Sequence, residues 1–197
     1  LPIKLLHSKW EECVTNIIPT REDAAAMAAR FRMESGRPLD EANPILDTST
    51  IVPGGRARVA IITKNLSPYG LAFAFRRHRS NPWTYPLFME NGTMNALSAG
   101  LLWFVVDAGR SVLFAGPRSS GKTSVLGATM MQIMKKYRII TVEDTLELPA
   151  EDMRSLGFNV VPLKVRSAIT KLETEISAEA GIRTALRLGD SCLIVGE

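Results

Sequence analysis

The stretch Ser111–Met130, SVLFAGPRSSGKTSVLGATM, decides the fold expected of this 197-residue chain. Its centre, Gly116–Thr123, matches the pattern G-x-x-x-x-G-K-[ST]. The apolar run Ser111–Ala115 predicts a strand before the pattern, and Lys122–Lys136 predicts a helix after it. Glycines permit a tight turn whose backbone N–H groups point at phosphate oxygens, and the helix N-terminus adds partial positive charge. The stretch therefore predicts a phosphate-binding loop between a buried strand and a helix.

Residues of this loop have distinct expected roles. Lys122 is expected to bridge the β- and γ-phosphates of a nucleoside triphosphate, and the Thr123 hydroxyl to ligate Mg²⁺. Arg118, in the middle of the loop, is expected to face solvent. The other residues expected to contact the nucleotide lie in the loop and the first helical turn: Gly116, Ser119, Ser120, Gly121 and Ser124. The expected cofactors are ATP and Mg²⁺.

Strand and helix patterns alternate around the loop. Arg138–Glu143 and Cys192–Val195 are nearly continuous apolar runs, typical of buried parallel strands, and Phe158–Val161 predicts a further short strand. Helices are predicted over Thr93–Asp107 and Ala178–Leu188. The alternation indicates the α/β class, with a mostly parallel sheet covered on both faces. In the first of these helices one side carries Leu97, Leu101, Phe104 and Val105.

The part of the chain before residue 81 predicts a different, α+β architecture. Thr20 and Asp23 form a capping-box pattern at the start of an Ala-rich helix over Arg21–Met33. The runs Arg58–Thr63 and Leu71–Phe75 predict short strands. We therefore expect a small α+β domain over 1–80, with 1–20 unassigned, a linker over 81–92, and a C-terminally incomplete α/β domain over 93–197.

The composition excludes several classes of protein. Hydrophobic residues make up 46% and charged residues 22% of the chain, which excludes a disordered tail. Two cysteines and two histidines are too few for a disulfide framework or a histidine-rich metal centre. The net charge of +4 is spread almost evenly, apart from the cluster Arg76-Arg77-His78-Arg79. The longest apolar stretch, near Leu97–Val106, is too short to span a bilayer.

Two carboxylates directly follow apolar strands, which makes them candidates for catalysis. Glu143 ends the run RIITVE, with Asp144 and Glu147 just beyond it, and Glu197 ends CLIVGE. The carboxyl ends of parallel strands form the ligand edge of such a sheet, so both side chains are expected near the phosphate loop. A carboxylate there can orient or deprotonate the attacking water. Glu143 is the first choice for this role and Glu197 the second, and the two roles are interchangeable.

Together these motifs resemble the secretion ATPase superfamily, the motors of type II and type IV secretion, type IV pili and archaella. Gly116–Thr123 is similar to its Walker A motif, Ile139–Glu147 to its Asp box, and Ala185–Glu197 to its Walker B strand. The sequences of the loop and of the segment LRLGDS are most similar to those of the archaeal branch. In this family an arginine that ends a strand of the N-terminal domain reaches the terminal phosphate. Arg76 is the matching position, with Arg77 and Arg79 as fallbacks.

The resemblance implies an ATP-hydrolysing motor that drives protein export or pilus assembly. Its RecA-like P-loop domain would follow a small N-terminal domain, and six copies would form a ring at the cytoplasmic face of the membrane. The implied partner is an inner-membrane platform protein, and no specific nucleic acid is expected. Because the match stops at the Walker B acid, Glu197, we expect a fragment that alone binds nucleotide weakly and turns it over poorly.

Other functions stay open at this stage. A RecA-type nucleic-acid translocase would bind DNA in a strongly salt-dependent way, and the even charge distribution argues against it. A nucleotide-gated assembly module would form rings on ATP binding with negligible phosphate release. A small-molecule P-loop kinase is disfavoured because no acceptor-binding lid is apparent in the N-terminal half.

Overall fold

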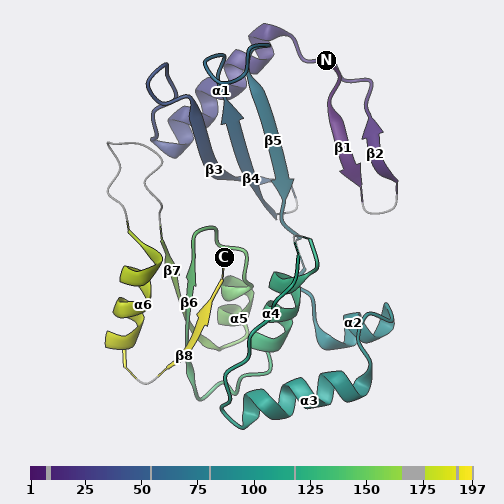
Figure 1. The fold of residues 1–197 in the computed structure, drawn as a ribbon, viewed down its shortest axis with the longest axis vertical. Coiled ribbons are helices and arrows are strands. Elements are labelled where there is room, and N and C mark those ends of the chain that lie inside the picture. The colour runs from purple at the N-terminus through teal and green to yellow at the C-terminus, as the bar shows by residue number, and fades with distance from the viewer. Residues whose placement is uncertain are drawn as a thin grey trace. The chain divides into compact units, whose positions relative to one another are not determined.

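The computed structural model describes residues 1–7, 10–53, 55–79, 81–117, 119–165, 176–189 and 191–196. The chain divides into two compact units, Leu1–Ser80 and Asn81–Glu197. Both mix helices and strands, and the sheets are antiparallel in the first unit and parallel in the second (Figure 1). The described helices are all too short or too polar to span a lipid bilayer.

The first unit is built on a three-stranded antiparallel sheet with helix α1 (Arg21–Ser35) across one face (Figure 1). The capping box is confirmed, because the Thr20 hydroxyl accepts from Asp23 N at 3.1 Å and Thr20 N donates to the Asp23 carboxylate at 2.9 Å. Gly36 ends the helix with φ of 65°. The sheet order is β3-β4-β5, with bounds β3 (Ile45–Val52), β4 (Gly55–Ile62) and β5 (Ala72–Arg77).

Three strands of this unit were not predicted. β3 pairs with β4 along its whole length, from Ile45 opposite Ile62 to Val52 opposite Gly55. The sequence pattern missed it because polar residues occupy its centre. The other two, β1 (Lys4–His7) and β2 (Glu11–Val14), form a separate antiparallel hairpin within residues 1–20. The core of the unit lies between α1 and the sheet and contains Ala28, Phe31, Leu46, Val59 and Ile61.

The second unit is built on a three-stranded parallel sheet of order β7-β6-β8. Its strands are β6 (Arg138–Glu143), β7 (Asn159–Lys164) and β8 (Cys192–Val195), so three of the four strands predicted for this unit are confirmed. Its helices are α2 (Tyr85–Glu90), α3 (Ala96–Asp107), α4 (Lys122–Met130), α5 (Ala150–Ser155) and α6 (Ala178–Arg187).

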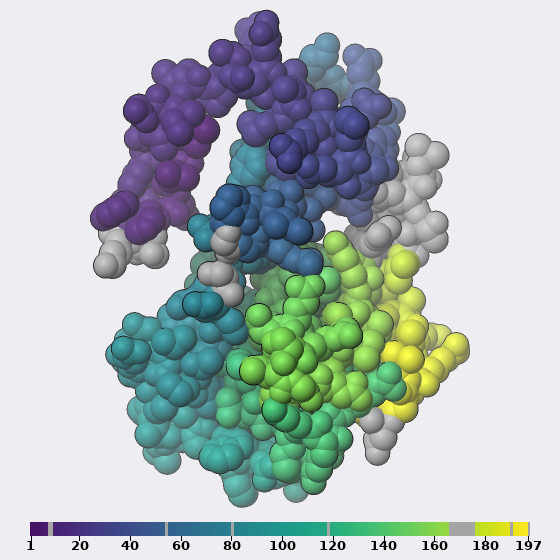
Figure 2. All heavy atoms as spheres, turned by 180° about the vertical axis from the view of Figure 1, so that it is seen from behind, coloured from purple at the N-terminus to yellow at the C-terminus, as the bar shows by residue number. Residues whose placement is uncertain are grey.

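Both faces of the parallel sheet are covered. Ile139 packs with Met130 of α4 and Met153 of α5, whereas Ile140 packs with Ala185 of α6. Figure 1 shows α6 on one side of the sheet and α4 and α5 on the other, and in Figure 2 green atoms of residues near 150 form the surface of this unit seen from behind. The central strand β6 is therefore buried from both sides, as its continuous apolar sequence predicted.

The segment before the loop departs from expectation. Ser111–Ala115 is not a strand, so that prediction is wrong. Within the described residues β8 pairs only with β6, and the apolar segment has no ladder partner that would make it a strand. Leu113 remains 90% exposed. The helix predicted over Lys122–Lys136 ends at Met130 and continues as turns.

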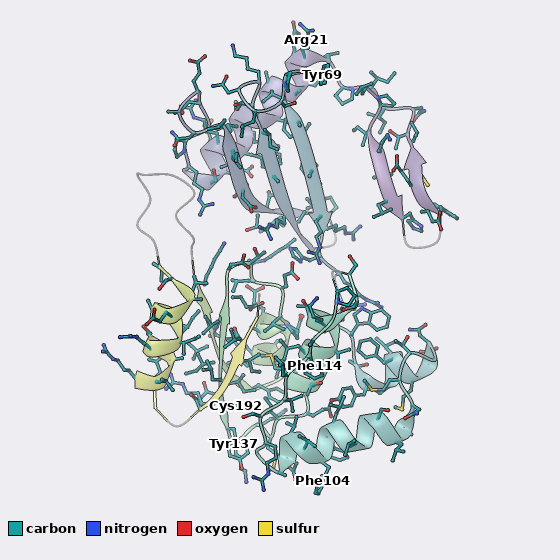
Figure 3. The ribbon with its side chains drawn as sticks, in the orientation of Figure 1. Arg21, Tyr69, Phe104, Phe114, Tyr137 and Cys192 are labelled. Carbon is teal, nitrogen blue, oxygen red and sulfur yellow. The ribbon has the colours of Figure 1, made fainter. Side chains whose placement is uncertain are left out.

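The two helices before this segment pack against α4. Residues 81–92, where a linker is expected, contain α2, whose Tyr85 and Phe88 are buried with Ala128 of α4. The Tyr85 hydroxyl lies 2.9 Å from Thr129 Oγ1. Ala99 is the buried residue of α3, and the apolar side noted in the sequence is largely solvent-facing; Figure 3 shows Phe104 on the outer side of the helix.

Candidate functional site: a phosphate-binding loop at a parallel sheet

The glycines of the loop occupy positions where a side chain would not fit or would be strained. A Cβ on Gly116 would lie 2.7 Å from Ser120 Oγ, closer than real contacts allow. Gly121 has φ of 85° and forms the N-cap of α4. Ser119 also has a positive φ, 61°, a conformation that is costly for a residue with a side chain. The loop is thus a tight, partly strained turn that leads directly into a helix.

Lys122 folds back over this turn. Its ammonium donates to the carbonyl oxygens of Gly116 at 3.1 Å and Pro117 at 2.8 Å. Because Gly121 has no side chain, no side-chain cap covers the first amides of the nine-residue helix α4. An ammonium, a helix N-terminus and a glycine turn converge at this point, and this combination suits an anionic group such as a phosphate.

A magnesium ion also fits the residues at the loop. Thr123 and Ser124 are half-buried in the first turn of α4, directly after Lys122. Within the described residues, no three His, Cys, Asp or Glu side chains gather into a group suited to a metal ion. Mg²⁺ keeps several waters and takes few protein ligands beside substrate phosphates, and a Thr hydroxyl at the start of the helix after such a loop is one ligand that it uses.

Glu143, the first candidate for orienting water, is almost fully buried at the end of β6. Its side chain is 2% exposed. Its Oε1 accepts hydrogen bonds from the backbone amides of Glu147 and Leu148, both at 2.9 Å. The Thr141 hydroxyl lies 3.4 Å from Oε2. Burial raises the pKa of the Glu143 carboxyl, although the two amide bonds oppose this shift.

The residue after β8, Gly196, packs against the Glu143 side chain. Gly196 N donates to Val142 O at 2.9 Å, which continues the pairing of β8 with β6. A Cβ on Gly196 would lie 2.8 Å from Glu143 Cγ. The sequence analysis did not single out Gly196, although a lone glycine directly after an apolar strand signals a close approach of this kind.

The remaining site candidates fall at several places. Asp144 is exposed and Glu147 half-buried, both in the loop after β6. Glu197 and Arg118 lie outside the described residues. Arg76 belongs to the first unit, near the end of β5.

The surroundings of Arg76 are strongly basic. It is exposed and stands directly opposite Arg58 of β4 in the strand register. Asp47 of β3 binds Arg58 in a bidentate manner, with Nε to Oδ1 at 3.1 Å and a second bond from Nη2 to Oδ2. The strand pairing thus gathers cationic side chains at this end of the sheet, and Asp47 partly balances them.

A glycine turn that leads into a helix beside a parallel sheet is typical of phosphate-binding α/β proteins. The family comparison is more specific. A model described as "Type II/IV secretion system protein" matches residues 11–197, and the chain belongs to this family, the type II/IV secretion ATPases. The resemblance noted in the sequence is therefore confirmed.

Two individual relatives are 30% identical to this chain or less over the matched residues, and both are longer than it. An uncharacterized protein of Methanocaldococcus jannaschii is 30% identical over 203 residues, which cover 100% of this chain and 27% of the relative. The type IV secretion system protein PtlH of Bordetella pertussis is 26% identical over 196 residues, covering 88% of this chain and 54% of the relative. The chain thus spans between about a quarter and half of the length of these relatives.

One solved structure also matches along the chain. It is the VirB11 ATPase from the Brucella suis type IV secretion system in complex with sulphate, with a TM-score of 0.40 and 19% identity. The match covers 99% of this chain and 60% of that one.

Proposed function

We propose that this chain is part of an ATP-hydrolysing motor of a type II or type IV secretion, pilus or archaellum-type system. The observation that carries the proposal is the loop Gly116–Thr123, whose glycine turn places Lys122 at the N-terminus of α4. Membership of the secretion ATPase family supports it. A RecA-like arrangement of the second unit is part of the proposal.

The residues of the loop divide the work of binding ATP. The amides of the loop and of the first turn of α4 hold the phosphates, and Lys122 leaves its two carbonyl partners to bind the β- and γ-phosphates. Mg²⁺ held by Thr123 would neutralise charge that develops on the transferred phosphoryl group. On the family resemblance we propose Arg76 as the arginine that neutralises charge on the terminal phosphate.

We assign the polarisation of the attacking water to Glu197 ahead of Glu143. This reverses the order preferred from the sequence. Glu143 is buried, and its Oε1 already accepts two backbone hydrogen bonds. In the sequence Glu197 comes directly after Gly196, whose amide extends the pairing of β8 with β6. The carboxyl edge of a parallel sheet is where its ligand binds.

The proposal extends to the assembly. The active form is a homohexameric ring at the cytoplasmic face of the membrane, where it acts on an inner-membrane platform protein. Type IV secretion is what the names of the Bordetella and Brucella proteins describe. Which machine this chain serves would follow from the genes that neighbour its own.

The decisive experiment is Lys122→Ala in the intact protein. Loss of the ammonium should lower ATP turnover by about 100-fold or more, because it removes charge stabilisation from the transferring phosphoryl group. Lys136→Ala is the matched control, since it removes an exposed lysine of the same unit outside the loop. Phosphate release measured at saturating ATP and Mg²⁺ tests both. Wild-type turnover in Lys122→Ala would refute the site.

A second candidate is a nucleotide-gated assembly module with little hydrolysis. The burial of Glu143 favours it, because one of the two candidate carboxylates is engaged by backbone amides. Such a module would assemble on ATP binding and release negligible phosphate. Sedimentation with ATP, run alongside the phosphate assay, separates the two functions.

A further inference from the structure

We propose that Glu143 is a positioning residue that fastens the loop 144–148 and the end of β8 to the end of β6. It thereby sets the positions of Asp144 and Glu147, and it does not itself activate water. The catalytic part of this inference rests on the proposed ATPase function. The structural part is independent of it.

The first step is that one carboxylate oxygen of Glu143 binds the backbone of the loop 144–148. Glu143 Oε1 accepts from the consecutive amides of Glu147 and Leu148, each at 2.9 Å. Two donors from neighbouring residues fix the direction of the backbone between them as well as its distance. Leu148 is also 7% exposed and packs in the core with Met130 and Met153. This contact therefore sets the loop that presents Asp144 and Glu147.

The second step is the fit of β8 against the same side chain. Gly196 N donates to Val142 O at 2.9 Å, so the chain after β8 passes directly beside Glu143. Its Cα carries no Cβ, and an added one would be 2.8 Å from Glu143 Cγ. The aliphatic part of Glu143 thus fills the space that a side chain at position 196 would need. A change in the position of Glu143 would therefore alter the packing of the Gly196 backbone at the end of β8.

The third step is that the carboxylate is poorly placed to act on water. A general base must reach the water within hydrogen-bond distance. The Glu143 side chain is 2% exposed, and its Oε2 lies against the Thr141 hydroxyl. The loop that it holds instead carries an exposed carboxylate, Asp144.

Three variants in the intact protein separate positioning from chemistry. Glu143→Gln keeps an oxygen acceptor for the two amides but cannot take a proton. Glu143→Ala removes the acceptor for both amides. Gly196→Ala adds a Cβ that would clash with the Glu143 side chain. Gly100→Ala is the matched glycine control, because an added Cβ there meets nothing within 4 Å.

The measurements are kcat and KM for ATP, and hydrogen exchange of the peptide that contains the amides of Glu147 and Leu148. We expect Glu143→Gln to keep turnover within about 5-fold of wild type with protected amides. Glu143→Ala should lose about 50-fold in kcat with little change in KM, and exchange at 147–148 should rise. Gly196→Ala should fall between the two, and Gly100→Ala should match wild type.

Two results would overturn the inference. One is a Glu143→Gln variant as inactive as Lys122→Ala while the amides of 147–148 stay protected, since that pattern marks a proton acceptor. The other is a Glu143→Ala variant whose exchange at 147–148 equals that of wild type. A wild-type protein that releases no phosphate would refute the proposed function alone, because the exchange measurement would still test the contact of Glu143 with the loop.

Discussion

The central strands of the two sheets, β4 and β6, bury their side chains in different ways. In β4 burial alternates, so that Ala57, Val59 and Ile61 face α1 while the residues between them are partly open. In β6 the residues from Ile139 to Glu143 are all buried. One covered face requires only every second residue to be apolar, whereas two covered faces require nearly all of them to be. At the end of this continuous pattern the buried Glu143 carboxyl is satisfied by two backbone amides.

The charged groups of the two sheets follow the same contrast. Glu143 of β6 is buried and held by two amides, so its loss would leave backbone donors without partners. Asp47 and Arg58 of the first sheet form an ion pair whose side chains are 26% and 34% exposed. Water screens such a pair, and its contribution to stability is small. The buried carboxylate is therefore a more sensitive point of the fold than the ion pair.

The largest effect should come from neighbouring isoleucines in the two strands. Ile139→Ala and Ile140→Ala should each lower the free energy of unfolding by about 3 kcal/mol, because both side chains are fully buried, on opposite faces. Ile61→Ala should cost a similar amount, but Ile62→Ala only about 1 kcal/mol, since Ile62 is half-buried. Chemical denaturation checks all four variants. Equal costs at positions 61 and 62 would contradict a one-sided sheet.

The same contrast explains how much the sequence could predict. A continuous apolar run such as Arg138–Glu143 predicts its strand without reference to other strands, because burial on two faces constrains every residue. β3 carries little signal, since its register depends on β4 and a partly open face tolerates polar residues. Ser111–Ala115 shows the opposite failure: an apolar pattern is not a strand until a neighbour supplies hydrogen bonds.

Only part of the candidate site could be predicted from the sequence, as with the strands. The loop residues follow from a local pattern, whose chemistry depends on neighbours in sequence. The surroundings of Glu143 do not, because Gly196 and the amides of 147–148 reach it only through the fold. Sequence reasoning could therefore mark Glu143 as important but not tell a base from a positioning group.

A smaller effect than core truncation should appear in the pH dependence of stability. Burial raises the pKa of Glu143, so the protonated form is favoured in the folded state. The stability this provides is fully present below the ordinary glutamate pKa, about 4.3, and is lost as pH rises through the raised value. Glu143→Gln does not titrate, so its unfolding free energy should decline less above about pH 4 than that of wild type.

Denaturation curves collected from about pH 4 to about pH 8 give this comparison, since the other titrating groups are common to both proteins. A difference between wild type and Glu143→Gln that stays constant across the range would contradict a raised pKa. A difference that grows in the opposite direction would mean that the two amide bonds outweigh burial.

The smallest effect should come from the exposed ion pair. Asp47→Asn removes the negative charge that faces Arg58, which then stands opposite Arg76 with less compensation. The cost should be about 0.5–1 kcal/mol at low salt, because the pair is partly solvated and like charges opposite each other repel. About 1 M salt should remove most of it, since screening then acts over about 3 Å. The double variant Asp47→Asn with Arg58→Gln is the control, because it removes both the pair and the repulsion. A cost of Asp47→Asn that is independent of salt would mean that Asp47 acts through its hydrogen bonds to Arg58, as Glu143 acts through its bonds to the loop amides, and not through its charge.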